Sequence, residues 1–408
     1  ISGNPIIRTG SIGGGNTGDS NGKIGSASIN ISGGDIQAQF VMAAGANNVP
    51  TFTMSGGVIS NSDVDSKEYM HMSKNGGAVY MEDGIFTMTG GTIRNCNAEN
   101  GGAVYIKGKN AENTSFSMTG GTIDNCMSKE NGGAVYLEGG NVTLSGGEIK
   151  NNLASQGNGG GVYVTAGNLY MPSAGTMSIN KNSALKRTSS NIGSESIGNG
   201  GGIYVTSATS DVNVSILSGV IENNSCDNNG GGICVDMSGS SAVAANVTIG
   251  ENGSTTPNIT GNKSIRWGGG LYAKGEKAQV TINGGKIQDN IVSNYVANED
   301  VTNELGTVVL NGGDVEYVTV TFDLNIPTGQ TASFPTGTNL NVTGQAFQNI
   351  VTATNTRLVY PGNPTCSNHN FVEWNTRADG DGVSYKSSEE KIMNIENNLT
   401  LYAIWSAQ

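Results

Sequence analysis

The sequence predicts an all-β fold, a right-handed parallel β-helix with three short strands per coil, followed by a separate small β-rich domain. Three observations support this prediction. A phrase of the type NGGAVYL occurs seven times, a second phrase of the type FTMSGGVISN alternates with it, and 63 of the 408 residues are glycine. Short strands with two-residue alternation and glycine at each corner do not form a helical repeat. Stacked coils of such strands form a parallel β-helix, and parallel crossover connections are almost always right-handed.

The first phrase predicts one inward and one outward set of side chains. Its copies start at Asn75, Asn100, Asn131, Asn158, Asn199, Asn229 and Trp267. The aliphatic residues in it, such as Val135 and Leu137, have the parity expected of the core. The opposite parity, which includes Ala134 and Glu138, is predicted to face outward. One outward position is a column of six tyrosines: Tyr80, Tyr105, Tyr136, Tyr163, Tyr204 and Tyr272.

The second phrase predicts the other two strands of each coil. Its FTM part and the isoleucine after the glycine pair again alternate, so Phe86, Met88 and Ile93 are predicted to face the core. An asparagine follows two residues after the isoleucine and is expected to turn inward and stack from coil to coil. These asparagines are Asn61, Asn95, Asn125, Asn151 and Asn223.

The glycine period ends near Val318, which predicts a domain boundary. We assign residues 1–317 to the β-helix, with 1–50 as an N-terminal cap and first coils, and residues 318–408 to a second domain. The second domain holds two of the three tryptophans and six of the eight prolines. Its predicted core is Phe322, Leu324, Val359, Phe371, Trp374, Leu399, Leu401, Tyr402 and Trp405.

Composition limits the partners and the cellular location. The net charge of −12 and the lack of a lysine or arginine cluster argue against nucleic acid and anionic membrane. No apolar run reaches the length of a membrane-spanning segment. We expect an exported monomer whose Ile1 follows a removed or uncloned export segment. Cys96 and Cys126 occupy matching places in successive repeats, either as two buried thiols or as a bridge.

The tyrosine column is the candidate binding site. A strip of rings with hydroxyl edges suits a sugar or a protein surface. The alternative is a self-packed ladder in which each ring stacks on the ring of the next coil. The column of Glu82, Lys107 and Glu138 beside it is predicted to be a solvated charge ladder.

A catalytic role has weaker support. β-Helix enzymes that cleave polysaccharides need two carboxylates at a fixed separation, or an acidic cation site with a base nearby. The candidates are Glu82, Glu138 and Asp236 on the outward parity, and Asp63, Asp65 and Glu68 in the loop 62–74. His71 and His369 are the only histidines and lie in different domains, so no multi-histidine metal site is predicted. No cofactor or metal ligand set is predicted.

Two motifs resemble known families. The C-terminal segment resembles the internalin B-repeat, or Listeria–Bacteroides repeat, through VTVTFD at 318–323, Phe371 and Trp374 of an F-x-x-W motif, and LTLYAIW at 399–405. The resemblance implies a β-grasp-like module of bacterial surface proteins without catalytic residues. The GGAV phrases at 76–79, 101–104 and 132–135 resemble the repeats of polymorphic outer-membrane adhesins.

These observations predict a cell-surface or secreted bacterial adhesin, non-catalytic, that binds a host or matrix protein or a polysaccharide through the lateral face and loops of the β-helix. Its anchor is expected in a segment outside this chain, and an anchor in the outer membrane is one option. One alternative is a polysaccharide lyase or glycoside hydrolase on a β-helix scaffold. The other is a structural spacer that holds the C-terminal module away from the cell.

Overall fold

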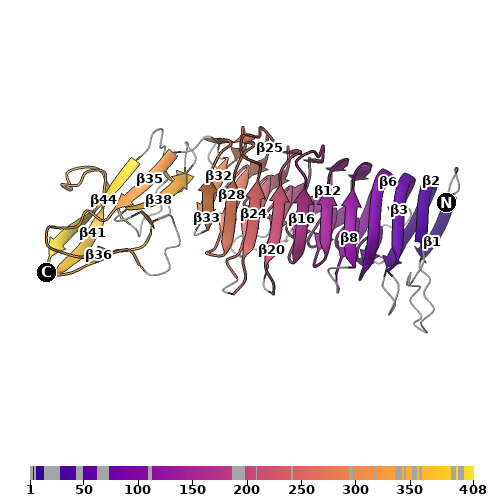
Figure 1. Ribbon diagram of the computed structural model, residues 1–408, viewed down its shortest axis with the longest axis horizontal. Helices are drawn as coiled ribbons and strands as arrows, with labels where there is room; N and C mark the ends of the chain where they lie inside the picture. Colours follow the sequence, from indigo (N-terminus) through magenta and orange to yellow (C-terminus); the bar gives the residue numbers. More distant parts are fainter. Residues whose placement is uncertain are drawn as a thin grey trace.

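The computed structural model shows an elongated all-β molecule with the chain termini at opposite ends (Figure 1). It describes residues 3, 6–12, 28–42, 49–61, 73–108, 113–185, 198–207, 209–239, 242–293, 297–298, 300–304, 306–315, 318–335, 342–343, 346–351, 356–357, 361–386, 392–393 and 399–408. Every element in these residues is a strand, and none of them forms a helix that could cross a bilayer. The all-β prediction is confirmed.

The predicted parallel β-helix is confirmed by the pairing of each strand with its counterpart in the next coil. The first phrase of each repeat forms the GGAVY face, with β5 (Val79–Met81), β7 (Val104–Ile106), β11 (Val135–Leu137), β15 (Val162–Val164), β19 (Ile203–Val205), β23 (Ile233–Asp236), β27 (Leu271–Lys274) and β32 (Val301–Glu304). The FTM face holds β8 (Thr114–Met118), β12 (Asn141–Leu144), β16 (Gly167–Met171), β20 (Val212–Ile216), β24 (Ala245–Ile249), β28 (Ala278–Ile282) and β33 (Thr307–Leu310). The isoleucine face holds β9 (Thr122–Asp124), β13 (Glu148–Lys150), β17 (Ser178–Asn180), β21 (Val220–Glu222), β25 (Asn258–Thr260), β29 (Lys286–Gln288) and β34 (Asp314–Val315). Handedness stays a prediction.

Most coils also contain a fourth, two-residue strand that the sequence pattern does not indicate. This short face holds β10 (Met127–Ser128), β14 (Leu153–Ala154), β18 (Ser183–Ala184), β22 (Ser225–Cys226), β26 (Lys263–Ser264) and β30 (Ile291–Val292), together with β4 (Ser73–Asn75). β31 (Ala297–Asn298) pairs antiparallel with β30. Only one residue of each two-residue strand is buried, which is too short a pattern to indicate a strand in the sequence.

The N-terminal coils use longer strands that turn the corners without a break. β2 (Ser28–Met42), β3 (Thr51–Asn61) and β6 (Gly84–Asn100) each contribute to more than one face. β1 (Ile6–Ile12) pairs with β2 at the end of the stack. β1 and β2 therefore belong to the stack, while the assignment of residues 1–50 as a cap and first coils stays a prediction.

The core consists of stacked like residues. Phe40, Phe52, Phe86 and Phe116 form a continuous stack with 4.7 Å between successive ring centroids. The predicted aliphatic columns are also fully buried. The alanines of the GGAVY phrase were expected to face outward, but Ala78, Ala103 and Ala134 are completely buried in the core. They sit at the corner just before the strand, where simple two-residue alternation no longer holds.

The corner before each GGAVY strand requires glycine. Gly101 has a φ of +60°, in the left-handed region that L side chains rarely adopt. A Cβ atom added to Gly102 would lie 2.1 Å from the carbonyl oxygen of Gly133 in the next coil. The paired glycines therefore allow two successive coils to approach closely.

The predicted asparagine column was wrong for most of its members. Asn95, Asn125, Asn151 and Asn223 have φ values of 52° to 55°. This left-handed backbone turns their side chains away from the core to the outer corner, because the chain must bend there after the isoleucine strand. Short polar residues tolerate this conformation better than other L residues. At this outer corner, Asn125 Nδ2 donates to Asn95 Oδ1 and Asn151 Nδ2 donates to Asp124 Oδ1, both at 2.8 Å. Asn61 Nδ2 donates to the Gly77 carbonyl oxygen at 2.7 Å.

The inward ladder is formed instead by the asparagine one residue later. Its members are Asn152, Asn182, Asn224, Asn262 and Asn290, all 0–1% exposed. Each Nδ2 donates to the Oδ1 of the next asparagine at 2.9–3.0 Å, and each backbone N–H donates to the same oxygen. Asp300 ends the ladder by accepting both bonds from Asn290. Buried amides that are fully hydrogen-bonded fix the register of one coil on the next.

The C-terminal strands form a sheet of their own. Its order is β36 (Ala332–Ser333), β40 (Thr365–Cys366), β41 (His369–Asn375), β44 (Leu399–Ala407), β35 (Val318–Asp323), β38 (Ala346–Val351) and β37 (Val342–Thr343), with β42 (Ser384–Tyr385) paired to β41. β39 (Thr356–Arg357) and β43 (Ile392–Met393) form a separate two-stranded sheet. Only the central pair β35–β44 is parallel, since the other pairs in the larger sheet are antiparallel.

This sheet packs around its own hydrophobic cluster. Val320, Phe322, Trp374, Tyr385, Leu401 and Ala403 are its buried members, and Phe371, Leu399 and Trp405 pack against them. Most of the predicted core is therefore confirmed, while Val359 lies outside the described residues. β38 lies against β32 of the last coil, at the junction visible in Figure 1.

Candidate functional site

The six predicted tyrosines lie in a single column on the GGAVY face. They occupy equivalent positions of paired strands. The ring centroids are 5.7 Å apart for Tyr80–Tyr105, 4.7 Å for Tyr105–Tyr136, 4.7 Å for Tyr136–Tyr163 and 5.2 Å for Tyr163–Tyr204. Cys234 follows Tyr204 in the column and separates it from Tyr272. The rings therefore form the self-packed ladder that was the alternative to an open strip.

The ladder is only partly accessible. Tyr105, Tyr204 and Tyr272 are 7%, 6% and 1% exposed, whereas Tyr80, Tyr136 and Tyr163 are half-buried. Tyr204, Cys234 and Tyr272 form a buried cluster of their own, with Tyr163 and Trp267 packed against it. A ligand on this face would meet mainly the edges of the three half-buried rings.

Carboxylates lie beside the phenol groups. The Tyr105 hydroxyl donates to Glu138. The pKa of Tyr80 is raised to about 12, mainly by burial and to a smaller extent by the negative charges of Glu82 and Glu138. The pKa of Tyr163 is also raised to about 12, mainly by burial and to a smaller extent by the negative charge of Asp236. Burial raises the pKa of Tyr105 above that of either. All of these tyrosines are therefore neutral hydrogen-bond donors at ordinary pH.

The predicted catalytic acids do not gather into one site. Glu82, Glu138 and Asp236 extend the same strands as the tyrosines, one to a coil, and the coils between them carry Lys107, Thr165 or Thr206. Within the described ranges, no three histidine, cysteine, aspartate or glutamate side chains form a group that could hold a metal ion. Asp63, Asp65, Glu68 and His71 lie outside those ranges. His369 is in β41, where Nδ1 lies 3.0 Å from the carbonyl oxygen of Ser367.

Cys96 and Cys126 are buried neighbours on successive coils. Both are free thiols, as are the other three cysteines. Burial, followed by the interaction with Cys126, raises the pKa of the Cys96 thiol well above its usual value. They precede Asn152 in the same column, and the backbone N–H of Cys126 donates to the Asn152 Oδ1 at 2.9 Å. These thiols thus occupy the position of the inward ladder in the earlier coils.

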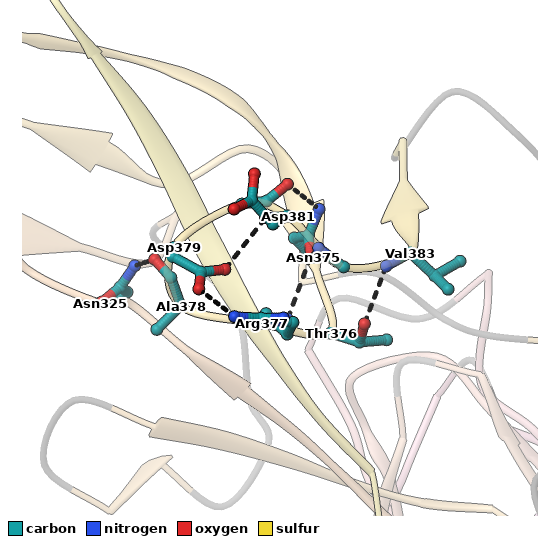
Figure 2. A network of polar contacts seen from close by, with 10 residues as sticks. Asn325, Asn375, Thr376, Arg377, Ala378, Asp379, Asp381 and Val383 are labelled. Atoms are coloured by element: carbon teal, nitrogen blue, oxygen red, sulfur yellow. Dashed lines mark hydrogen bonds and ion pairs between the residues drawn. The ribbon is translucent and has the colours of Figure 1, made fainter.

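The C-terminal sheet contains a tightly hydrogen-bonded loop between β41 and β42 (Figure 2). The buried Asn375 Oδ1 accepts the backbone N–H groups of Arg377 at 3.0 Å and Gly382 at 2.9 Å. Asp379 accepts the backbone N–H of Asp381 and pairs with Arg377, and both contacts lower its pKa. The charges of this loop therefore stabilise its own turn.

A second contact joins this loop to β35. Asn325, which follows β35, donates through Nδ2 to the carbonyl oxygens of Ala378 at 2.9 Å and Ala403 at 3.0 Å. Asn325 was not identified from the sequence, whereas Asn375 directly follows the F-x-x-W motif. Asn325 bonds to backbone atoms, and Asn375 bonds to backbone atoms of the loop and to the Glu373 carboxylate at 3.1 Å, which indicates a structural role for both.

A comparison with family models identifies the C-terminal part. The predicted resemblance of this segment is confirmed, and the resemblance of the β-helix to polymorphic outer-membrane adhesins stays a prediction. No curated protein and no solved structure matches the chain. Residues 311–404 match the Listeria–Bacteroides repeat domain.

Proposed function

We propose that this chain is an exported, non-catalytic bacterial surface protein of the adhesin type, which binds a host or matrix protein or a glycan along the lateral surface of its β-helix. The observation that carries this proposal is that the GGAVY face repeats a tyrosine at the same position in five successive coils, from Tyr80 to Tyr204. A ligand that is long or multivalent meets equivalent groups on successive coils, which is how solenoid surfaces are commonly used. The Listeria–Bacteroides repeat at 311–404 supports a surface location, because such repeats occur in surface-associated bacterial proteins.

The tyrosine column is one candidate surface for this binding. Tyr80, Tyr136 and Tyr163 keep part of each ring at the surface, and the buried ring of Tyr105 stacks between Tyr80 and Tyr136 and holds the column rigid. Rigid aromatic side chains lose little conformational entropy on binding. The carboxylates Glu82 and Glu138 beside them favour ligands that offer hydroxyl, amide or basic groups.

The test uses the full chain with Tyr80→Ser and Tyr136→Ser combined. Binding is measured on arrays of matrix proteins and glycans. We expect at least a tenfold loss of affinity for the ligand that the unaltered chain selects. Glu222→Ser, on the isoleucine face, is the matched control and should leave affinity unchanged. Circular dichroism confirms that both variants keep the fold.

The other outcomes assign the alternatives. Unchanged binding by the tyrosine variant removes this column from the binding site. If the unaltered chain binds no ligand, the spacer function is supported. Release of reducing ends or unsaturated products from the same glycans would establish a hydrolase or lyase in place of a binding protein.

A further inference from the structure

The FTM face differs from the other faces because its outward positions carry no charge. Two outward columns run along it, two residues apart on each strand. The first column is Ser28, Thr51, Ile85, Ser115, Asn141, Asn168, Asn213, Asn246, Gln279 and Thr307. The second is Asn30, Thr53, Thr87, Ser117, Thr143, Tyr170, Ser215, Thr248, Thr281 and Val309. Hydroxyl and amide groups fill all but two of these positions.

The neutrality is a property of this face alone. The isoleucine face carries Arg94, Asp124, Glu148, Lys150, Glu222 and Lys286 on its strands. The GGAVY face carries Glu82, Lys107, Glu138, Asp236 and Lys274. The whole chain has a net charge of −12. A ligand on these two columns therefore meets no charged side chain of the FTM strands, and Asp211 and Lys277 lie just before β20 and β28.

The amides of this face are held in a fixed row. Asn168 Nδ2 donates to Asn141 Oδ1 at 2.8 Å, Asn213 Nδ2 to Asn168 Oδ1 at 3.1 Å, and Asn246 Nδ2 to Asn213 Oδ1 at 3.2 Å. A primary amide has two N–H donors and two acceptor lone pairs, and the row uses one of each at Asn168 and Asn213. Both side chains are exposed. The row thus presents oriented donors and acceptors that have already lost their rotational freedom.

Tyr170 supplies an aromatic surface in the middle of this row. It is 41% exposed, more than any tyrosine of the GGAVY column, which the structure shows buried or half-buried. Asn168 precedes it by two residues on the same face of β16, and Thr143 and Ser215 are its neighbours in the adjacent coils. Figure 1 shows β12, β16 and β20 side by side in the row of FTM strands. An exposed ring flanked by amides and hydroxyls matches a pyranose, which has an apolar C–H face and a hydroxyl rim.

We propose that the FTM face, centred on Tyr170, Asn168 and Asn213, binds a neutral polysaccharide. This inference rests on the proposed binding function and assigns it a ligand class and a face. Tyr170 stacks on the C–H face of one sugar, and the amide row and the hydroxyls of Thr143 and Ser215 bond to the sugar hydroxyls. Coils are about 4.8 Å apart, close to the length of one sugar in an extended chain. Successive sugars along the coil axis therefore meet equivalent groups.

The test measures binding of cellohexaose, mannohexaose and chitohexaose to the full chain by calorimetry, with polygalacturonate as the charged comparison. At least one neutral hexasaccharide should bind, and Tyr170→Ser should weaken it at least tenfold. Tyr170→Trp should retain the affinity because a stacking surface remains. Asn213→Asp adds a charge and removes both N–H donors of the amide, and it should weaken binding as well. Lys150→Ser on the isoleucine face is the control and should have no effect.

Three results would overturn the inference while leaving the proposed function in place. The first is neutral glycan binding that Tyr170→Ser does not change. The second is binding of polygalacturonate in preference to every neutral hexasaccharide. The third is binding of a matrix protein, lost on substitution of Tyr80 and Tyr136, with no glycan bound. Absence of any ligand for the unaltered chain would overturn both proposals.

Discussion

At the scale of single residues, Asn224 shows how one side chain fixes the stacking of coils. Its Oδ1 accepts the backbone N–H and the Nδ2 of Asn182, both at 3.0 Å. Its Nδ2 donates to the Ile179 carbonyl oxygen and to Asn262 Oδ1, both at 2.9 Å. All of these groups are buried, so water cannot replace Asn224 as their partner.

We therefore expect Asn224→Leu to destabilise the protein strongly although the side chain keeps the same branching and number of heavy atoms. Each buried polar group left without a partner costs about 1–3 kcal/mol, so the total should be about 3 kcal/mol or more. The midpoint of urea unfolding, followed by circular dichroism, measures this loss. Asn246→Ala is the control from the exposed amide row, where water can replace the lost bond, and it should change stability by about 0.5 kcal/mol or less. Equal effects of both substitutions would contradict a special role for the buried ladder.

Asn223 and Asn224 also show what could be read from the sequence and what could not. Two-residue alternation correctly placed Ile221 in the core, and its extension predicted Asn223 as the inward residue. The backbone enters the left-handed region at Asn223, with a φ of 54°, so alternation fails and the next residue points inward. Lys181 takes the same conformation without being an asparagine. The signal was present as the doubled asparagine in 151–152 and 223–224, whereas the turn that gives it meaning is a three-dimensional feature.

At the scale of the element, the tyrosine column was predicted correctly as one column, but its burial was not. Parity identifies which residues share a face, and it carries no information on how far stacked rings cover one another. Centroid distances of 4.7–5.7 Å leave little room for solvent between the rings of Tyr80 to Tyr204. Tyr170 was not predicted as a site residue because it lies on the FTM face, outside the repeated GGAVY phrase that drew attention to the tyrosines.

The tyrosine ladder predicts a loss of stability at alkaline pH. Burial raises the pKa of Tyr80 and Tyr163 to about 12 in the folded state, from 10.0 for the ordinary side chain. Between pH 10 and 12 the unfolded chain has therefore lost these protons while the folded chain retains them. The contribution of these two tyrosines to the free energy of unfolding is therefore constant below about pH 10 and falls as the pH rises further.

Absorbance of the phenolate, recorded together with circular dichroism from pH 8 to 13, tests this expectation. The ladder tyrosines should ionise only as the fold is lost. Complete ionisation near pH 10 with the β signal intact would show that the rings are not buried as described.

At the scale of the whole molecule, the chain combines a rod with a module at its C-terminal end. The two parts have separate sheets and separate hydrophobic clusters. The sequence predicted both parts, because the glycine period and the closing LTLYAIW motif are local signals. The contact between β38 and β32 brings together segments that share no sequence pattern, so it could not be predicted.

We expect residues 318–408 to fold without the β-helix. The family match begins at residue 311, but Asp314 and Val315 pair with β29 and belong to the last coil. The module has its own buried centre in Phe322, Trp374 and Leu401, so the boundary should lie after that coil.

A fragment of residues 318–408 should unfold cooperatively, with the blue-shifted fluorescence of the fully buried Trp374. Trp374→Phe should remove that blue-shifted component. A fragment of residues 311–408 provides the comparison, because a native spectrum from the longer fragment alone would move the boundary into the last coil. Solvent-exposed tryptophan emission from both fragments would mean that the module requires the coil beneath β38 to fold.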